Sequence, residues 1–107
     1  MKNIAIFASG SGTNAENLIK FFRTSPFGKV QIVLSNRAGA GVLEKAQLLD
    51  IESFVFNREQ FYNSEAVLDV LLERHIDFIV LAGFLWLVPE YLLQAFENKI
   101  VNIHPAL

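Results

Sequence analysis

The sequence predicts an α/β domain in which a parallel sheet of about five strands lies between two helical layers, a three-layer Rossmann-like fold. Its 107 residues give room for one domain, and 52% of them are hydrophobic against 19% charged. Short apolar runs alternate with segments of helical spacing, which predicts right-handed β-α-β crossovers. We expect the strand order 3-2-1-4-5, with the chain reversing direction beside the first strand.

Five apolar runs have the length and composition of strands. The first and fourth are nearly continuous and rich in β-branched residues, as expected for strands buried on both faces. The runs are residues 3–8, 30–34, 53–56, 78–82 and 100–103. In such sheets ligands bind beyond the carboxyl ends of the strands, where the strand order reverses. The loops that follow these runs are therefore the candidate sites.

Four segments between the strands carry apolar residues at helical spacing. They are residues 14–23, 42–49, 65–75 and a segment that begins near position 89. Ser64 is expected to cap the third helix, and Pro89 to stand in the first turn of the fourth. His75 falls at the end of the third helix, where a cation favours the helix dipole, and we interpret it as structural.

Composition excludes several classes of protein. No apolar run approaches the ~20 residues that span a bilayer. The absence of cysteine excludes disulfides, thiolate metal sites and cysteine nucleophiles. A net charge of -2 with scattered basic residues argues against a nucleic-acid-binding face. We expect a soluble cytoplasmic α/β domain.

The stretch "ASGSGTN", residues 8–14, follows the first strand. Gly10 and Gly12 allow a sharp turn and a close approach to a ligand. Three polar residues stand where free amides of a helix N-terminus could hold a phosphate: Ser11, Thr13 and Asn14. Ala15 breaks the dinucleotide fingerprint, and no lysine follows as a P-loop requires. A plain tight turn before a helix is the alternative, and "SNRAGAGV" after the second strand resembles a simple connector more than a second anion site.

The stretch "LAGFLWLVP", residues 81–89, is unusually apolar for a loop. Phe84 to Val88 stand where polar turn residues would be expected. This segment could wall a pocket for a flat aromatic ligand and hold its polar edge through backbone groups. Core filling under the fourth helix, or an oligomer contact, explains the residues equally well.

The last strand brings Asn102 and His104 to one face, because they are two residues apart. Their α-carbons should lie ~6.6 Å apart, and Pro105 favours an extended backbone at His104. The amide can donate to a developing oxyanion, and an imidazole exchanges protons near neutral pH. No serine or cysteine nucleophile accompanies them, which favours direct transfer to a substrate. A structural histidine is the alternative.

Together "FASGSGTN", "LAGFLWLVP" and "NIHPAL", in this order, resemble the phosphoribosylglycinamide formyltransferases of purine biosynthesis along the whole chain. The resemblance implies that Gly12, Thr13 and Asn14 hold the phosphoribosyl substrate, glycinamide ribonucleotide. It implies that the pterin end of the co-substrate 10-formyltetrahydrofolate binds to a run of four residues: Leu85, Trp86, Leu87 and Val88. Many members have arginine where this chain has Trp86, and Arg58 is the nearest match to a further arginine that contacts the folate.

The same resemblance makes Asn102 and His104 catalytic. The glycinamide amine attacks the formyl carbon, Asn102 contacts the co-substrate and steadies the oxyanion, and His104 shuttles protons without a metal. It further implies that residues 1–107 are the N-terminal, substrate-binding half of an enzyme of roughly 190–210 residues, a length that still forms one domain. The second half carries an aspartate that tunes the histidine, so we expect the 107 residues alone to be inactive. The long sheet could support a homodimer.

Two other functions stay open. Formyltetrahydrofolate deformylase has a similar asparagine-histidine pair with water as the acceptor, but it has a second histidine where this chain has Pro105 and usually begins with a regulatory domain. A non-catalytic phosphate- or nucleotide-binding module would fit if the chain were complete. Methionyl-tRNA formyltransferase lacks the pattern of the first loop.

Overall fold

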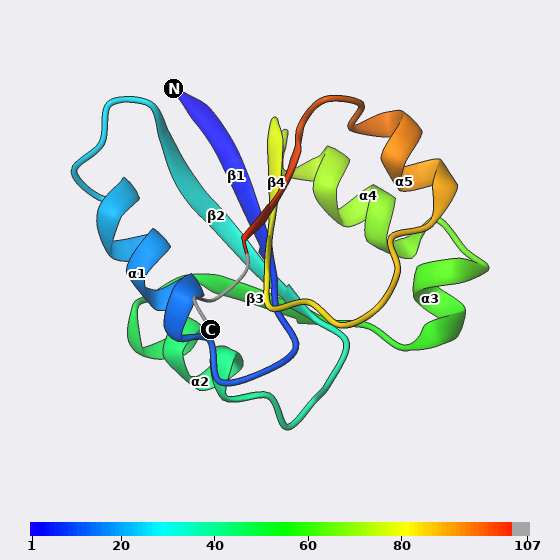
Figure 1. The fold of residues 1–107 in the computed structure, drawn as a ribbon, viewed down its shortest axis with the longest axis horizontal. Helices are drawn as coiled ribbons and strands as arrows, with labels where there is room; N and C mark the ends of the chain where they lie inside the picture. The colour runs from blue at the N-terminus through cyan, green and yellow to red at the C-terminus, as the bar shows by residue number, and fades with distance from the viewer. Residues whose placement is uncertain (104–107) are drawn as a thin grey trace.

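Five parallel strands form one sheet in the order β3-β2-β1-β4-β5, which confirms the expected order. The computed structural model describes residues 1–103. The strands are β1 (Lys2–Phe7), β2 (Gly28–Ser35), β3 (Glu52–Val55), β4 (Phe78–Ala82) and β5 (Ile100–Ile103). β1 pairs with β2 on one side and with β4 on the other, so the chain reverses direction beside β1. All five strands end at one edge of the sheet, as Figure 1 shows.

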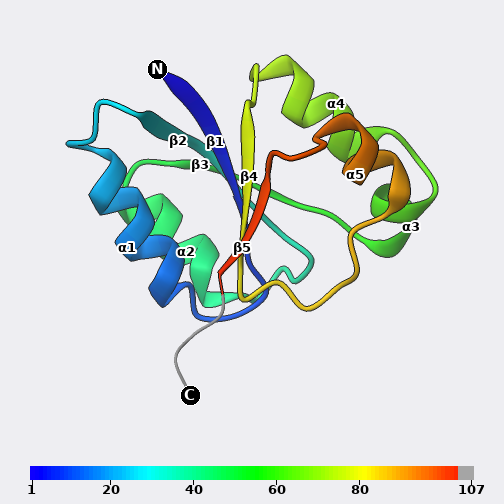
Figure 2. The same cartoon turned by 45° about the horizontal axis from the view of Figure 1, so that its top comes forward.

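Helices cover both faces of the sheet and complete the three predicted layers. They are α1 (Thr13–Phe22), α2 (Gly41–Leu48), α3 (Arg58–Tyr62), α4 (Ala66–Glu73) and α5 (Glu90–Ala95). The first two lie on one face and the other three on the opposite face, as Figure 2 shows. No helix within residues 1–103 has the length and apolar character needed to cross a membrane.

The short helix α3 is absent from the sequence prediction. Its start is fixed by a capping box: the Asn57 side chain accepts from the Gln60 amide at 2.8 Å, and the Gln60 side chain accepts from the Asn57 amide at 2.9 Å. Phe61 anchors the helix, because its ring is fully buried. The cap and one buried ring hold a helix too short to show a periodic pattern.

All four predicted helix starts lie one residue from the observed starts, and the predicted roles of Ser64 and Pro89 are wrong. Glu65, not Ser64, is the N-cap of α4. The Ser64 hydroxyl instead donates to the Gln60 carbonyl at 2.9 Å and accepts from the Ala66 amide at 3.2 Å. This hydroxyl therefore closes the turn between α3 and α4, because it bonds to both. Pro89 is the N-cap of α5 rather than part of its first turn.

The core lies on both faces of the sheet, and the face under α3, α4 and α5 is aromatic. Phe56 and Phe61 stack with ring centroids 4.6 Å apart, and Phe7 lies 6.0 Å and 6.2 Å from them. Phe84, from the loop after β4, meets Phe7 edge-on at 5.5 Å. The loop after β4 is thus built into this aromatic core, which we define as Phe7, Phe56, Phe61, Phe84 and Trp86 with Tyr62 at its margin.

Candidate active site

The glycine loop, residues 8–12, joins β1 to the start of α1 at the carboxyl edge of the sheet. Gly12 is the N-cap of α1, and no side chain among the described residues caps this helix start. The amides of Thr13 and Asn14 therefore face the loop without a side-chain acceptor. A cavity of about 370 Å³ lies here, lined by residues 10–14 together with Ala82, the last residue of β4, and Gly83. The arrangement suits a small anion such as a phosphate.

Gly12 is required by packing as well as by the turn. Its φ of +80° lies in the left-handed region. A Cβ added there would lie 2.6 Å from the Cβ of Val42 and 2.7 Å from its Cα. The Val42 amide also donates to the Gly10 carbonyl at 3.1 Å. The absence of a side chain at Gly12 thus lets the glycine loop sit directly on the first turn of α2.

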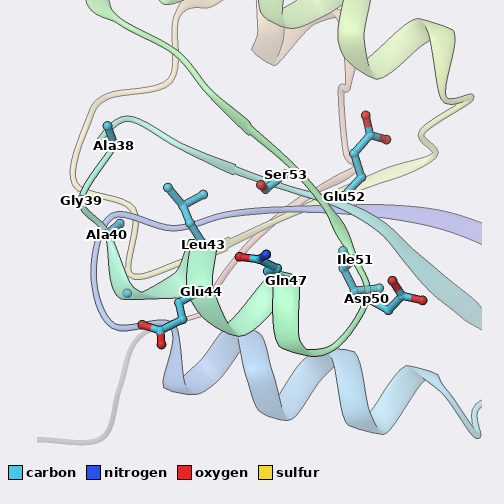
Figure 3. A pocket seen from close by; sticks show the side chains of 11 residues that line it. Ala38, Gly39, Ala40, Leu43, Glu44, Gln47, Asp50, Ile51, Glu52 and Ser53 are labelled. Carbon is cyan, nitrogen blue, oxygen red and sulfur yellow. The ribbon is translucent and has the colours of Figure 1, made fainter.

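The second glycine pair lies beside a separate pocket of about 580 Å³, on α2 and the edge strand β3, shown in Figure 3. The charged side chains that line this pocket are all carboxylates, those of Glu44, Asp50 and Glu52. A lining of this charge disfavours an anion. The structure therefore favours a connector over a second phosphate site at Gly39 and Gly41.

The loop after β4, residues 83–88, alternates between half-buried and exposed side chains. Phe84, Trp86 and Val88 pack against the aromatic core. Leu85 and Leu87 point outward and are 77% and 85% exposed. The prediction that this loop fills the core therefore holds for its three inward-facing side chains. The outward-facing leucines and the backbone between them are exposed at the carboxyl edge of the sheet.

Arg58, the first residue of α3, lies against this loop. Its guanidinium carbon is 4.4 Å from the centroid of the Trp86 ring and 6.0 Å from that of Tyr62. The Tyr62 hydroxyl donates to the Leu87 carbonyl at 2.7 Å. The structure thus brings together Arg58 and Trp86, which the sequence assigns to the folate, and attaches the loop to α3.

Asn102 lies on β5 opposite Leu81 of β4. Because side chains alternate along a strand, its amide shares a face with Ile100, which packs against the hydrophobic cluster under α3, α4 and α5. Asn102 is exposed, and β4 separates its strand from β1 and the glycine loop. Three predicted site segments, the glycine loop, the loop after β4 and the end of β5, therefore lie at the carboxyl ends of the adjacent strands β1, β4 and β5. His104 lies outside the described residues.

Sequence reasoning missed Ser9, a fully buried serine that follows β1. Its hydroxyl donates to the Asn36 side-chain oxygen at 2.7 Å and accepts from the Leu85 amide at 2.9 Å. The Arg37 guanidinium donates to the Ser9 carbonyl at 3.4 Å. The only signal in the sequence is a polar residue directly after a buried strand.

Charge and titration add little to the site itself. Burial raises the pKa of Tyr91, whose hydroxyl donates to the Phe61 carbonyl at 2.7 Å and so fastens α3 to α5. Within residues 1–103 no three histidine, cysteine or carboxylate side chains are grouped to hold a metal ion. The groups that the candidate site offers among these residues are backbone amides, the hydroxyls of Ser11 and Thr13, the Asn102 side chain and the Arg58 guanidinium.

The family model described as "Formyl transferase" matches residues 2–107. Phosphoribosylglycinamide formyltransferase of Bacillus subtilis is 33% identical over all of this chain and 57% of its own length, and that of Haemophilus influenzae is 38% identical over all of this chain and 53% of its own. Among solved structures, glycinamide ribonucleotide transformylase 1 of Geobacillus kaustophilus is 42% identical, with a TM-score of 0.87 over all of this chain and 60% of that protein. The chain spans just over half the length of the curated relatives that it matches. Because the family model covers nearly every residue, this chain belongs to the formyl transferase family.

Proposed function

We propose that residues 1–107 are the N-terminal, substrate-binding half of a phosphoribosylglycinamide formyltransferase. The reaction moves the formyl group of 10-formyltetrahydrofolate to the amine of glycinamide ribonucleotide. The observation that carries the proposal is the junction of the glycine loop with loop 83–88, whose Leu85 amide donates to the Ser9 hydroxyl at 2.9 Å. The two segments proposed to face the ligands are thus in contact, and Asn102 lies on β5 next to β4. Relatives of that name match the chain over its whole length.

The glycine loop would take the phosphate of glycinamide ribonucleotide. The amides of Thr13 and Asn14 open α1, where the helix dipole favours negative charge. The Ser11 and Thr13 hydroxyls lie 3.4 Å apart, close enough to donate to one phosphate together. Gly12 keeps this end of the loop against α2, so the amides are held in place before the ligand arrives.

Loop 83–88 would take the pterin ring of the folate. Its outward-facing leucines, Leu85 and Leu87, offer apolar surface, and backbone groups between them can pair with the polar edge of a flat heterocycle. Trp86 and Val88 are turned inward and would act by holding the loop in shape. Arg58, stacked on Trp86, places a cation beside this surface for an anionic part of the folate.

The proposed chemistry is direct transfer. The amine nitrogen forms a bond to the formyl carbon, and negative charge develops on the formyl oxygen, to which the Asn102 amide would donate. The bond from that carbon to the folate nitrogen then breaks. One proton leaves the amine and one arrives on the folate nitrogen, and we assign this transfer to His104 from the sequence alone. The reaction would run in the cytoplasm, without a metal, and a homodimer stays a prediction.

A formyl-transfer assay tests this proposal with glycinamide ribonucleotide or water as the acceptor. It is run on the 107-residue chain and on a fusion of that chain to the second half of the G. kaustophilus relative. We expect the fusion to form formylglycinamide ribonucleotide, and Asn102→Ala to slow it by about 10²–10³-fold. Asn17→Ala, an exposed asparagine on α1, is the matched control. Release of formate with water as the acceptor would instead indicate a deformylase.

A further inference from the structure

Ser9 occupies the point where three strand ends meet. It follows β1, its side chain is fully buried, and its hydroxyl joins Asn36, just after β2, to Leu85, just after β4. The two partners lie 27 and 76 residues away in sequence. A buried hydroxyl that bonds to two segments so distant in sequence makes a specific tertiary contact, unlike a loop hydroxyl that is hydrated by solvent.

The direction of the hydrogen bonds explains why a hydroxyl is needed here. The single proton of Ser9 points to the Asn36 oxygen, which leaves the lone pairs of the hydroxyl free for the Leu85 amide. The Ser9 backbone adds two bonds, since its amide donates to Gly83 at 3.3 Å and its carbonyl accepts from Arg37 at 3.4 Å. Alanine would keep the backbone bonds but leave the Leu85 amide without its acceptor.

We propose that Ser9 is a positioning residue that holds loop 83–88 at a fixed place against the glycine loop. One side of Ser9 continues into the residues around the phosphate-sized cavity, and the other side holds Leu85, the first outward-facing residue of loop 83–88. If one substrate binds at each of these surfaces, the Ser9 hydroxyl would fix the position of the two substrates relative to each other. The placement rests on the structure alone, and its catalytic meaning rests on the proposed function.

A small displacement of loop 83–88 should lower the rate strongly, because a transfer reaction depends on the distance between its reacting atoms. Reacting atoms must approach to about 3–3.5 Å, and a shift of about 1 Å in one substrate can cost about 10²-fold in rate. Loop 83–88 is held at its far end by Tyr62, through the Leu87 carbonyl, and at its near end by Ser9. Loss of the Leu85 bond would leave residues 84–86 held by the packing of Phe84 and Trp86 alone, between the bonds to Gly83 and Leu87.

The first test compares Ser9→Ala with Ser35→Ala in the 107-residue chain. Ser35 is a matched control: it is fully buried at the end of β2, and its hydroxyl bonds to Arg37 alone among the described residues. We measure hydrogen exchange of the Leu85 amide and acrylamide quenching of Trp86, the single tryptophan. We expect the Leu85 amide to exchange about tenfold faster in Ser9→Ala than in Ser35→Ala, with stronger quenching of Trp86.

Equal exchange at Leu85 in the two variants would overturn the proposal. If Ser9→Ala fails to fold, Asn36→Ala replaces it, because Asn36 orients the Ser9 proton while the serine stays in place. In Asn36→Ala the Leu85 amide should still exchange several-fold faster than in Ser35→Ala. An unchanged rate there would count equally against the positioning role.

The second test adds inorganic phosphate and follows amide resonances. In the wild-type chain, phosphate should shift Gly12 and Thr13 directly and Leu85 through Ser9. In Ser9→Ala the shifts at Gly12 and Thr13 should persist and the shift at Leu85 should fall at least about threefold. A Leu85 shift of the same size in both proteins would overturn the coupling. If phosphate shifts neither Gly12 nor Thr13 in the wild type, the proposed phosphate site fails, and the exchange comparison still decides the role of Ser9.

Discussion

The Arg58 guanidinium lies 4.4 Å from the centroid of the Trp86 ring and so places a cation on the face of an indole. Trp86 in turn contacts Phe56 and Phe61, with centroids 5.9 Å and 6.1 Å away. The positive charge therefore sits on the outer end of a continuous aromatic core that reaches the sheet. Because the indole also belongs to loop 83–88, this contact links α3 to the proposed folate surface.

Replacement of Arg58 should uncover Trp86. In Arg58→Ala we expect acrylamide to quench the tryptophan more strongly, and the free energy of unfolding to fall by about 0.5–1 kcal/mol. Arg58→Lys keeps the charge but loses the flat stacking surface, so its quenching should be intermediate. Quenching that is the same in all three proteins would show that Arg58 does not cover the ring in solution.

The Tyr62 hydroxyl should hold loop 83–88, whereas the Tyr91 hydroxyl should not. Each donates to a carbonyl at 2.7 Å, Tyr62 to Leu87 and Tyr91 to Phe61. Tyr62→Phe and Tyr91→Phe should each reduce the free energy of unfolding by about 0.5–1.5 kcal/mol. Only Tyr62→Phe should raise amide exchange across residues 84–88, measured by NMR. A rise of equal size in Tyr91→Phe would contradict a specific attachment of the loop.

Gly12→Ala should be strongly destabilising even without ligand. The new Cβ would meet both Cα and Cβ of Val42 at under 3 Å, and the φ of +80° is unfavourable for alanine. We expect a loss of about 2–4 kcal/mol in urea unfolding. Gly10→Ala is the control, because nothing lies within 4 Å of its added Cβ. Its free energy of unfolding should stay within about 0.5 kcal/mol of wild type, and a similar loss in both variants would argue against the contact with Val42.

His75→Gly should stabilise the protein. His75 follows the end of α4 with a φ of 52°, a conformation that glycine adopts freely and other residues do not. We expect a gain of about 0.5–1 kcal/mol in thermal or urea unfolding. His75→Ala removes the imidazole and keeps the unfavourable φ, so it should give no gain. Stabilisation of equal size by alanine would mean that the imidazole itself is unfavourable.

Glu52 should make the stability depend on pH at the acid end. A bidentate hydrogen bond from Arg74, at 2.8 Å and 2.5 Å, lowers the pKa of Glu52 below its ordinary value of 4.5. The stabilisation is therefore fully present above about pH 4.5 and is lost as the pH falls through the lowered pKa. Glu52→Gln should reduce the stability above pH 4.5 and flatten its decline below that pH.

Glu73→Gln is the control for this pair, since that carboxylate is 3.8 Å from Arg74 and 72% exposed. Urea unfolding between pH 3 and pH 6 should give Glu73→Gln the same acid decline as the wild type. A decline in Glu52→Gln as steep as in the wild type would assign the acid sensitivity to other carboxylates.

The fold was predictable because its signals are local and repeated. The runs at residues 3–8 and 78–82 are apolar and β-branched, and crossover handedness then leaves few strand orders. Helix α3 escaped prediction because its five residues are too few for periodicity. Its capping pair, Asn57 and Gln60, is visible in the sequence but weak without an apolar run behind it.

The candidate site was likewise predictable from the sequence only in part. Gly12 and Asn102 stand in motifs whose spacing alone places them at strand ends. Ser9 could not be assigned, because its partners come from two other strand ends and their distance in space is set by the sheet. Arg58 and Trp86 were both predicted as site residues, but their contact was not, because it depends on helix α3.

The position of β1 in the sheet also governs how the chain acquires its structure during synthesis. β1 begins at Lys2, but its second neighbour is β4, and the Asn3 amide bonds to the Asp77 carboxylate 74 residues later. Until β4 leaves the ribosome, the backbone N–H and C=O groups of β1 have no partner on that side. Contacts between such distant residues slow folding and leave strand edges open to aggregation. Slow, chaperone-sensitive maturation is the expected consequence of placing the first strand at the centre.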